Sequence, residues 1–206
     1  MGEVKRIGID LDNTLINYDG VFRAFATERG LVAPELAISK LHVRTALRAL
    51  PEGDLAWQRL QGAVYGRGVR DAVLFDGADA FLRLARERRC EVFVVSHKTE
   101  FGHHDPERIN LRHAALEWMT ARGFFHAEGF AIPEVNVTFA ATRAEKIAVI
   151  RALGVNVFID DLPEVLKDAE FPESVMGILF TGGAETLGCY PRAYANWREI
   201  TAMVFG

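Results

Sequence analysis

The stretch RIGIDLDNTLIN, residues 6–17, decides the fold. It begins as an apolar, β-branched run, which is typical of a buried strand. The run ends in two acids, Asp10 and Asp12, whose side chains leave the same face of an extended backbone. Asn13 follows them, and asparagine tolerates the left-handed conformation that a tight exit from a strand needs. We therefore expect a buried strand with two carboxylates crowded beyond its tip.

Two carboxylates at the tip of a buried strand repel each other. Burial and like charge raise a carboxyl pKa, so one acid would bind a proton unless a cation neutralised the pair. For a bare DxD pattern, a strand-end turn with solvated acids is an equal alternative. The longer string here, an apolar strand followed by DxDxT and a leucine, is a more specific pattern and favours a site with crowded acids over a solvated turn.

Composition limits the class of protein. A chain of 206 residues, half apolar and one quarter charged, fits one globular domain with room for a modest insertion. The net charge of −4 gives no electrostatic case for a nucleic-acid or anionic-membrane partner. We find no targeting segment and no apolar run long enough to span a bilayer. With two cysteines and no signal peptide, we expect free thiols and a cytoplasmic location.

Apolar runs alternate with helical patterns along the rest of the chain. Buried strands are predicted at residues 91–96, 135–139, 155–161 and 175–180, with a short extended segment at 73–75. Near-continuous apolar strands separated by helices indicate a parallel sheet that is covered on both faces. The fold class is therefore α/β, a Rossmann-like parallel sheet of about five strands with helices on both faces.

Helical patterns fill the interval between the first two strands. We expect helices at residues 21–30, from Ala33 or Pro34 to residue 50, and at 55–68 with Asp54 as N-cap. A single crossover helix needs about a third of this length. We therefore predict a catalytic core at 1–16 and 73–206 and a small helical insertion at 17–72. The alternative is that these helices simply cover one face of the sheet.

Chemically unusual residues follow the predicted strands. In open parallel sheets, binding sites lie beyond the carboxyl ends of the strands. There this sequence places three groups of polar residues, which are Asp10, Asp12 and Thr14 after the first strand, Ser96 and Lys98 after the second, and Asp160 and Asp161 after the fourth.

Four motifs in order resemble those of the haloacid dehalogenase (HAD) superfamily of phosphatases and related hydrolases. That family carries DxDx[TV] after strand one, a Ser or Thr after strand two, a Lys near the start of a later helix and acids after strand four. This chain offers Asp10-Leu-Asp12-Asn-Thr14, Ser96, Lys146 and Asp160-Asp161. The resemblance implies a HAD-type sheet with the insertion as a cap.

The resemblance also implies the chemistry. A member of this family with these motifs would be a Mg²⁺-dependent phosphoric monoester hydrolase acting on a small phosphorylated metabolite. Asp10 would be the nucleophile that forms an aspartyl-phosphate, and Asp12 would be the general acid and base. Mg²⁺ would be held by Asp10, the backbone carbonyl of Asp12, and Asp160. The second acid of the motif is kept by phosphatases of the family and lacked by its dehalogenases.

Three further residues would serve the phosphate group in this resemblance. Ser96 would donate to a phosphoryl oxygen, Lys146 would supply positive charge, and Thr14 would help hold the loop. Lys98 competes with Lys146, because it lies two residues after Ser96 and is one of only five lysines. We favour Lys146 on spacing and leave Lys98 to contact substrate or solvent. Asp161 could bind the metal directly, through water, or orient Lys146.

Other readings remain open at this stage. FIDDLPE, residues 158–164, loosely resembles a string in family members that load units onto carrier proteins, so a phosphotransferase is one rival. A phospho-receiver switch is another, although receivers place their acid after the third strand, where this chain has none. The His97, His103, His104 and Asp105 group matches no zinc spacing, and a polar loop is favoured. No pattern specifies the substrate or the oligomeric state.

Overall fold

The computed structural model describes residues 5–36, 39–104, 107–183 and 190–206, and it divides the chain into two compact units. One unit comprises Met1–Ile16, Leu74–Lys98 and Thr120–Gly206, and the other comprises Asn17–Val73 and Thr99–Met119. Two short strands, β2 (Ile16–Asn17) and β3 (Val73–Leu74), form a separate two-stranded sheet.

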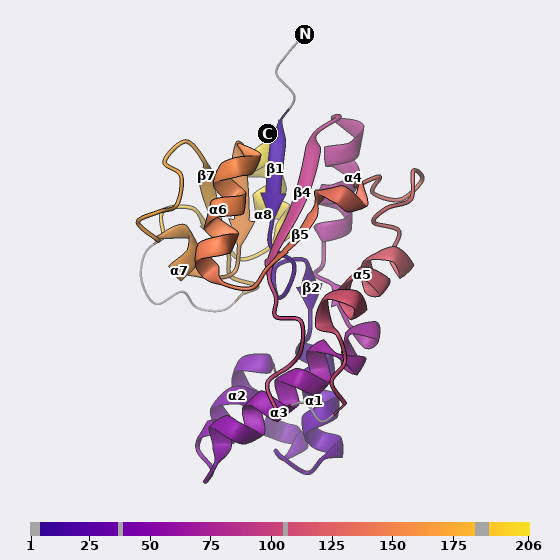
Figure 1. Cartoon of the computed structure of the whole chain (residues 1–206), viewed down its shortest axis with the longest axis vertical. Helices are drawn as coiled ribbons and strands as arrows, with labels where there is room; N and C mark the ends of the chain where they lie inside the picture. The colour runs from indigo at the N-terminus through magenta and orange to yellow at the C-terminus, as the bar shows by residue number, and fades with distance from the viewer. Residues whose placement is uncertain (1–4, 37–38, 105–106, 184–189) are drawn as a thin grey trace. The chain divides into compact units, whose positions relative to one another are not determined.

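The first unit is built on a six-stranded parallel sheet (Figure 1). Its strand order is β5-β4-β1-β6-β7-β8. The strands are β1 (Arg6–Ile9), β4 (Glu91–His97), β5 (Val137–Ala140), β6 (Val157–Asp160), β7 (Met176–Phe180) and β8 (Ala193–Tyr194). The predicted α/β class with a parallel sheet is confirmed.

Helices cover both faces of this sheet (Figure 1). On one face α6 (Arg143–Leu153) and α7 (Pro163–Leu166) pack over a core around Phe158. On the other, α4 (Ala78–Glu87) packs against α8 (Trp197–Phe205). Gly8 in β1 is required by the first of these cores, because a Cβ there would lie 2.5 Å from Cδ2 of the Phe158 ring.

The sixth strand was not predicted. β8 has only two residues, and they pair with Leu179 and Phe180 at the edge of the sheet. A two-residue strand has no alternation of apolar and polar side chains to detect, so only the tertiary structure reveals it.

The second unit is helical. Its α-helices are α1 (Asp19–Glu28), α2 (Lys40–Arg48), α3 (Gly53–Tyr65) and most of α5 (Leu111–Ala121). It also contains the 3₁₀ turns Pro34–Leu36 and Arg67–Asp71. Another 3₁₀ turn, Glu134–Asn136, belongs to the first unit, where it precedes β5. Phe22 stacks on Trp57 with ring centroids 5.0 Å apart, and both side chains are buried. These aromatic residues thus form core.

Residues 99–119 join this helical unit, whereas the sequence analysis assigned them to the core. Two contacts explain the grouping. The Trp118 indole donates to the Ala72 carbonyl at 2.9 Å, and Arg67 pairs with Glu107 at 3.3 Å. The sequence Asp105-Pro106 predicts a helix start, with Asp as N-cap and Pro at the first helical position, but both residues lie outside the described residues.

Two expected helix starts were wrong. The helix expected to run from residue 33 or 34 to 50 is interrupted, because Ser39 starts α2 by accepting a hydrogen bond from the His42 N–H. The next helix begins at Gly53 rather than after Asp54. A Cβ at Gly53 would lie 2.0 Å from the Leu47 carbonyl oxygen, so only glycine permits this close turn.

Candidate active site

Three adjacent strands bring two of the predicted acids and Ser96 together. The Asp10 N–H donates to the Ile159 carbonyl at 2.9 Å, which extends the pairing of β1 with β6 by one residue. Asp10 therefore lies beside Asp160, the last residue of β6. On the other side of β1, β4 carries Ser96 within the strand rather than after it. Because β4, β1 and β6 are neighbours, Asp10, Asp160 and Ser96 all lie at the carboxyl ends of the strands.

The loop after β1 turns back as predicted. Asn13 has a φ of 64°, the left-handed conformation that the sequence analysis expected of it. The Leu15 N–H donates to the Leu11 carbonyl at 3.0 Å and closes the turn. Thr14 is fully buried, and its hydroxyl donates to Asp10 Oδ2 at 3.2 Å. In this structure the Thr14 hydroxyl orients the Asp10 carboxylate.

Lys146 reaches the acids from the first turn of α6. Thr142 caps that helix by accepting a hydrogen bond from the Glu145 N–H, and a threonine followed three residues later by glutamate is the sequence pattern of such a cap. The Lys146 ammonium lies 2.6 Å from Asp10 Oδ1 and 2.6 Å from Asp160 Oδ2. Its side chain is 1% exposed. Of the two candidate lysines, Lys146 is the one bonded to Asp10.

Burial governs the protonation of this group. Removal from water raises the pKa of Asp10 to about 7, and the Lys146 ammonium only partly opposes that shift. Burial likewise raises the pKa of Asp160. For Lys146, burial alone would lower the pKa, but its two carboxylate partners outweigh burial and raise it. The lysine thus stays charged and holds two acids that are costly to ionise.

Lys98 pairs with Asp12, the other acid of the loop after β1. Its ammonium lies 2.6 Å from Asp12 Oδ2, and its side chain is only 2% exposed. The sequence offered one signal, the position of Lys98 two residues after Ser96. It did not indicate that Asp12 would be the partner.

Two polar atoms at the site are buried without a directed hydrogen bond among the described residues. They are Ser96 Oγ and Asp160 Oδ2, and the latter has only its ion pair with Lys146. Buried polar groups in native proteins nearly always have hydrogen-bond partners. Ser96 Oγ is therefore available to donate to an acceptor on a ligand, whereas Asp160 Oδ2 already contacts the Lys146 ammonium.

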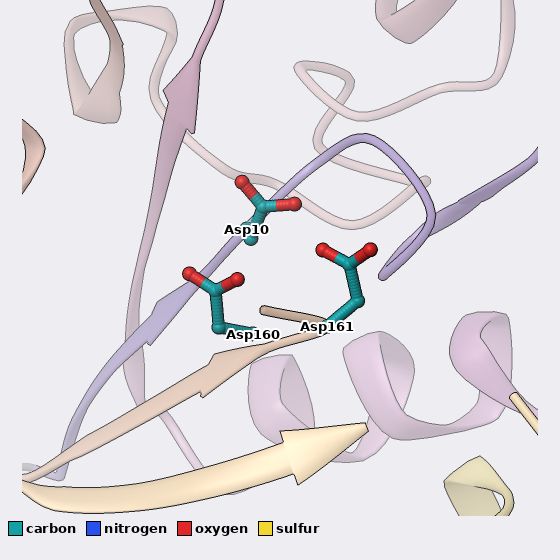
Figure 2. Close-up of side chains that lie close together, drawn as sticks. All are labelled: Asp10, Asp160 and Asp161. Carbon is teal, nitrogen blue, oxygen red and sulfur yellow. The ribbon is translucent and has the colours of Figure 1, made fainter. Parts of the chain in front are cut away.

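Three carboxylates form a group that could hold a metal ion. Asp10, Asp160 and Asp161 each offer an oxygen, and the three oxygens lie within 4.8 Å of one another. Figure 2 shows them gathered at the ends of β1 and β6. An all-oxygen set with few protein carboxylates suits Mg²⁺. If Asp10, Asp12, Asp160 and Asp161 were all ionised and Lys98 and Lys146 both charged, the site would carry a formal charge of −2, which one divalent cation would balance.

Other candidates do not join this group. Within the described residues, these three acids are the one cluster of His, Cys, Asp or Glu that could hold a metal. His97 Nε2 lies 3.0 Å from the Ala141 carbonyl, and Asp105 is outside the described residues.

In the described part of the chain, no helix has the length and hydrophobicity needed to cross a membrane.

Comparison with known proteins identifies the fold. No protein-family model matches the chain, and neither does any curated protein. Among solved structures, a dehalogenase with an intermediate complex aligns with a TM-score of 0.58 at 12% identity, covering 98% of each chain. A HAD-family hydrolase from Deinococcus radiodurans with bound phosphate and sodium aligns at 0.55 and 16%, covering 98% of this chain and 95% of the other.

A third structure extends the likeness. It is the putative HAD-hydrolase YfnB from Bacillus subtilis bound to magnesium, with a TM-score of 0.54 and 10% identity over 99% of this chain and 100% of the other. The chain therefore has the fold of HAD-superfamily hydrolases, as its motifs indicated.

Proposed function

We propose that this chain is a Mg²⁺-dependent phosphatase that hydrolyses a small phosphorylated metabolite through an aspartyl-phosphate on Asp10. The observation that carries the proposal is the position of the Asp10 carboxylate. It lies among the Lys146 ammonium, the Thr14 hydroxyl and the two acids at the end of β6, Asp160 and Asp161. A buried carboxylate surrounded in this way is oriented, and it lies beside both a fixed cation and a metal-binding group.

A phosphate monoester resists attack because its negative charge repels an anionic nucleophile. A carboxylate attacks only where cations neutralise and hold the phosphoryl group. Lys146 supplies one fixed positive charge. Asp10 and Asp160, with Asp161 and the backbone carbonyl of Asp12, would hold Mg²⁺, which supplies further charge neutralisation to the phosphoryl oxygens when it is bound.

Two steps account for the reaction. An Asp10 carboxylate oxygen attacks phosphorus while the bond to the leaving oxygen breaks, and Asp12 gives a proton to that oxygen. Water then attacks phosphorus, Asp12 takes one of its protons, and the bond between phosphorus and Asp10 breaks to release inorganic phosphate. Asp10 and Asp12 return to their starting protonation states, so the chain is a true catalyst.

Ser96 and Lys146 would bind the phosphoryl oxygens during both steps. The buried Ser96 hydroxyl has no partner among the described residues and can donate to an incoming oxygen without breaking another bond. Lys146 would then share its protons between Asp10 and the phosphoryl group.

The presence of Asp12 favours phosphoryl chemistry over dehalogenation. Structural neighbours include a dehalogenase, so the fold alone allows either reaction. A leaving alkoxide needs a proton, whereas a leaving halide does not. The acid two residues after the nucleophile supplies that proton. By the resemblance, the helical unit that follows β1 would serve as a cap, which suits a small substrate.

The experiment is a turnover assay on aryl and alkyl phosphates with Mg²⁺. We expect steady release of inorganic phosphate, abolished by Asp10→Asn and by a chelator and restored when Mg²⁺ is added back. Asp79→Asn is the matched control, because Asp79 is exposed on α4. Absence of turnover on every phosphate monoester, or full activity of Asp10→Asn, would contradict the proposal.

A further inference from the structure

We propose that Lys98 is a positioning residue that holds the Asp12 side chain in place for proton transfer to the leaving group. The inference rests on the proposed function, because it gives Lys98 a task within that reaction. Its basis is the buried ion pair in which Lys98 Nζ lies 2.6 Å from Asp12 Oδ2.

The backbone fixes where Lys98 begins. Its N–H donates to the Ala140 carbonyl at 2.9 Å, which continues the pairing of β4 with β5 by one residue beyond His97. The side chain therefore starts from an ordered sheet edge next to the site. Only 2% of it is exposed, so Lys98 does not extend into solvent.

The sheet constrains Asp12 less than it constrains Asp10. Asp10 continues the β1–β6 ladder and has Thr14 and Lys146 as partners. Asp12 lies in the turn beyond the sheet, and its side chain remains 16% exposed. A proton donor must lie within hydrogen-bond reach of the leaving oxygen. The ion pair with a buried lysine restricts the directions that the Asp12 carboxylate can take.

The competing role for Lys98 is direct binding of the phosphoryl group. The two roles predict different kinetics. Phosphoryl binding would help every substrate equally, because all esters carry the same phosphate. Positioning of Asp12 would matter most where the leaving oxygen is basic, because a poor leaving group depends on the proton it receives.

The first experiment compares kcat for Lys98→Met on an alkyl phosphate and on an aryl phosphate with a strongly acidic phenol. We expect kcat to fall by roughly 100-fold on the alkyl ester, because a misplaced Asp12 no longer protonates the leaving oxygen efficiently. On the aryl ester we expect kcat to fall by only a few-fold. Lys167→Met is the matched control and should change neither rate, since Lys167 is exposed. Equal losses on both esters, or a change in KM alone, would overturn the proposal.

The second experiment adds Lys98→Met to Asp12→Asn. If Lys98 acts through Asp12, the double variant is no slower than Asp12→Asn alone on the aryl ester. Independent roles would multiply the two losses, and that result would assign Lys98 to the phosphate instead.

Thermal melting tests the ion pair without any turnover. Both single variants should lower Tm, and the double variant should lower it by less than the two shifts combined, because each single change leaves a charge without its partner. Additive shifts would overturn the proposal. An inactive wild-type chain with non-additive shifts would refute the phosphatase function while supporting the link between Lys98 and Asp12.

Discussion

Lys146 and Asp10 form a buried ion pair, with Nζ 2.6 Å from Oδ1 and neither side chain more than 6% exposed. The same ammonium lies 2.6 Å from Asp160. One cation therefore compensates two buried acids that come from neighbouring strands. This arrangement links the stability of the sheet edge to the chemistry proposed for it.

Lys146→Met should damage both stability and activity. It leaves two carboxylates buried without their cation, and breaking a buried pair in this way costs about 3–5 kcal/mol of unfolding free energy. Urea denaturation of the metal-free protein measures the loss, with Lys167→Met as the control. An unchanged midpoint for Lys146→Met would show that the lysine does not pair with Asp10 and Asp160 in solution.

Ser96→Ala should separate stability from function. The Ser96 hydroxyl is buried and has no hydrogen-bond partner among the described residues. Removing it therefore removes the free-energy cost of burying an unpaired polar group. We expect unfolding free energy to stay within about 1 kcal/mol of wild type or to rise. We expect kcat/KM to fall by roughly 100-fold, the usual effect of removing one donor to a developing oxyanion. Ser174→Ala, at an exposed position, is the control for both measurements. A destabilised Ser96→Ala with normal kcat/KM would assign Ser96 a structural role.

The stability of the metal-free protein should fall as pH rises from about 4 to about 7. Burial raises the pKa of Asp10 from 3.8 to about 7 in the folded chain. Within that window the folded state keeps a proton that the unfolded state has lost, so raising the pH disfavours folding. Tm measured against pH should therefore slope downward there, and Asp10→Asn should flatten the slope. An upward slope that Asp10→Asn leaves unchanged would contradict the assignment.

Mg²⁺ should stabilise the protein, and more so at pH 8 than at pH 5.5. The metal would replace the proton on Asp10 and Asp160, so it competes less well where Asp10 stays protonated. Titrations followed by Tm measure the effect, and Asp160→Asn should remove it while Asp79→Asn retains it. A Mg²⁺-induced rise in Tm that persists in Asp160→Asn would place the metal elsewhere.

Much of the fold could be predicted because each core strand is a near-continuous apolar run. The parallel sheet and the acids at its edge follow from that pattern and from the rule that sites lie beyond the carboxyl ends of strands. The left-handed Asn13 followed from its side chain, and the cap of α6 followed from the spacing of Thr142 and Glu145.

The remaining features depend on contacts distant in sequence. Strand β8 is defined only by its pairing with β7. The start of α3 is set by the approach of Gly53 to the Leu47 carbonyl. The partner of Lys98 could not be predicted from spacing, because the sequence places both Lys98 and Lys146 near the same predicted site. The tertiary structure pairs Lys146 with Asp10 and Lys98 with Asp12.

The central claim is that Asp10 attacks phosphorus, and a single-turnover reaction in ¹⁸O-labelled water tests it most directly. Mass spectrometry of the quenched protein should find one phosphoryl group on the peptide containing Asp10. After completion, the ¹⁸O should be in the released phosphate, because water attacks phosphorus. No phosphoryl group on that peptide, or ¹⁸O in the Asp10 carboxylate instead of the phosphate, would contradict the account.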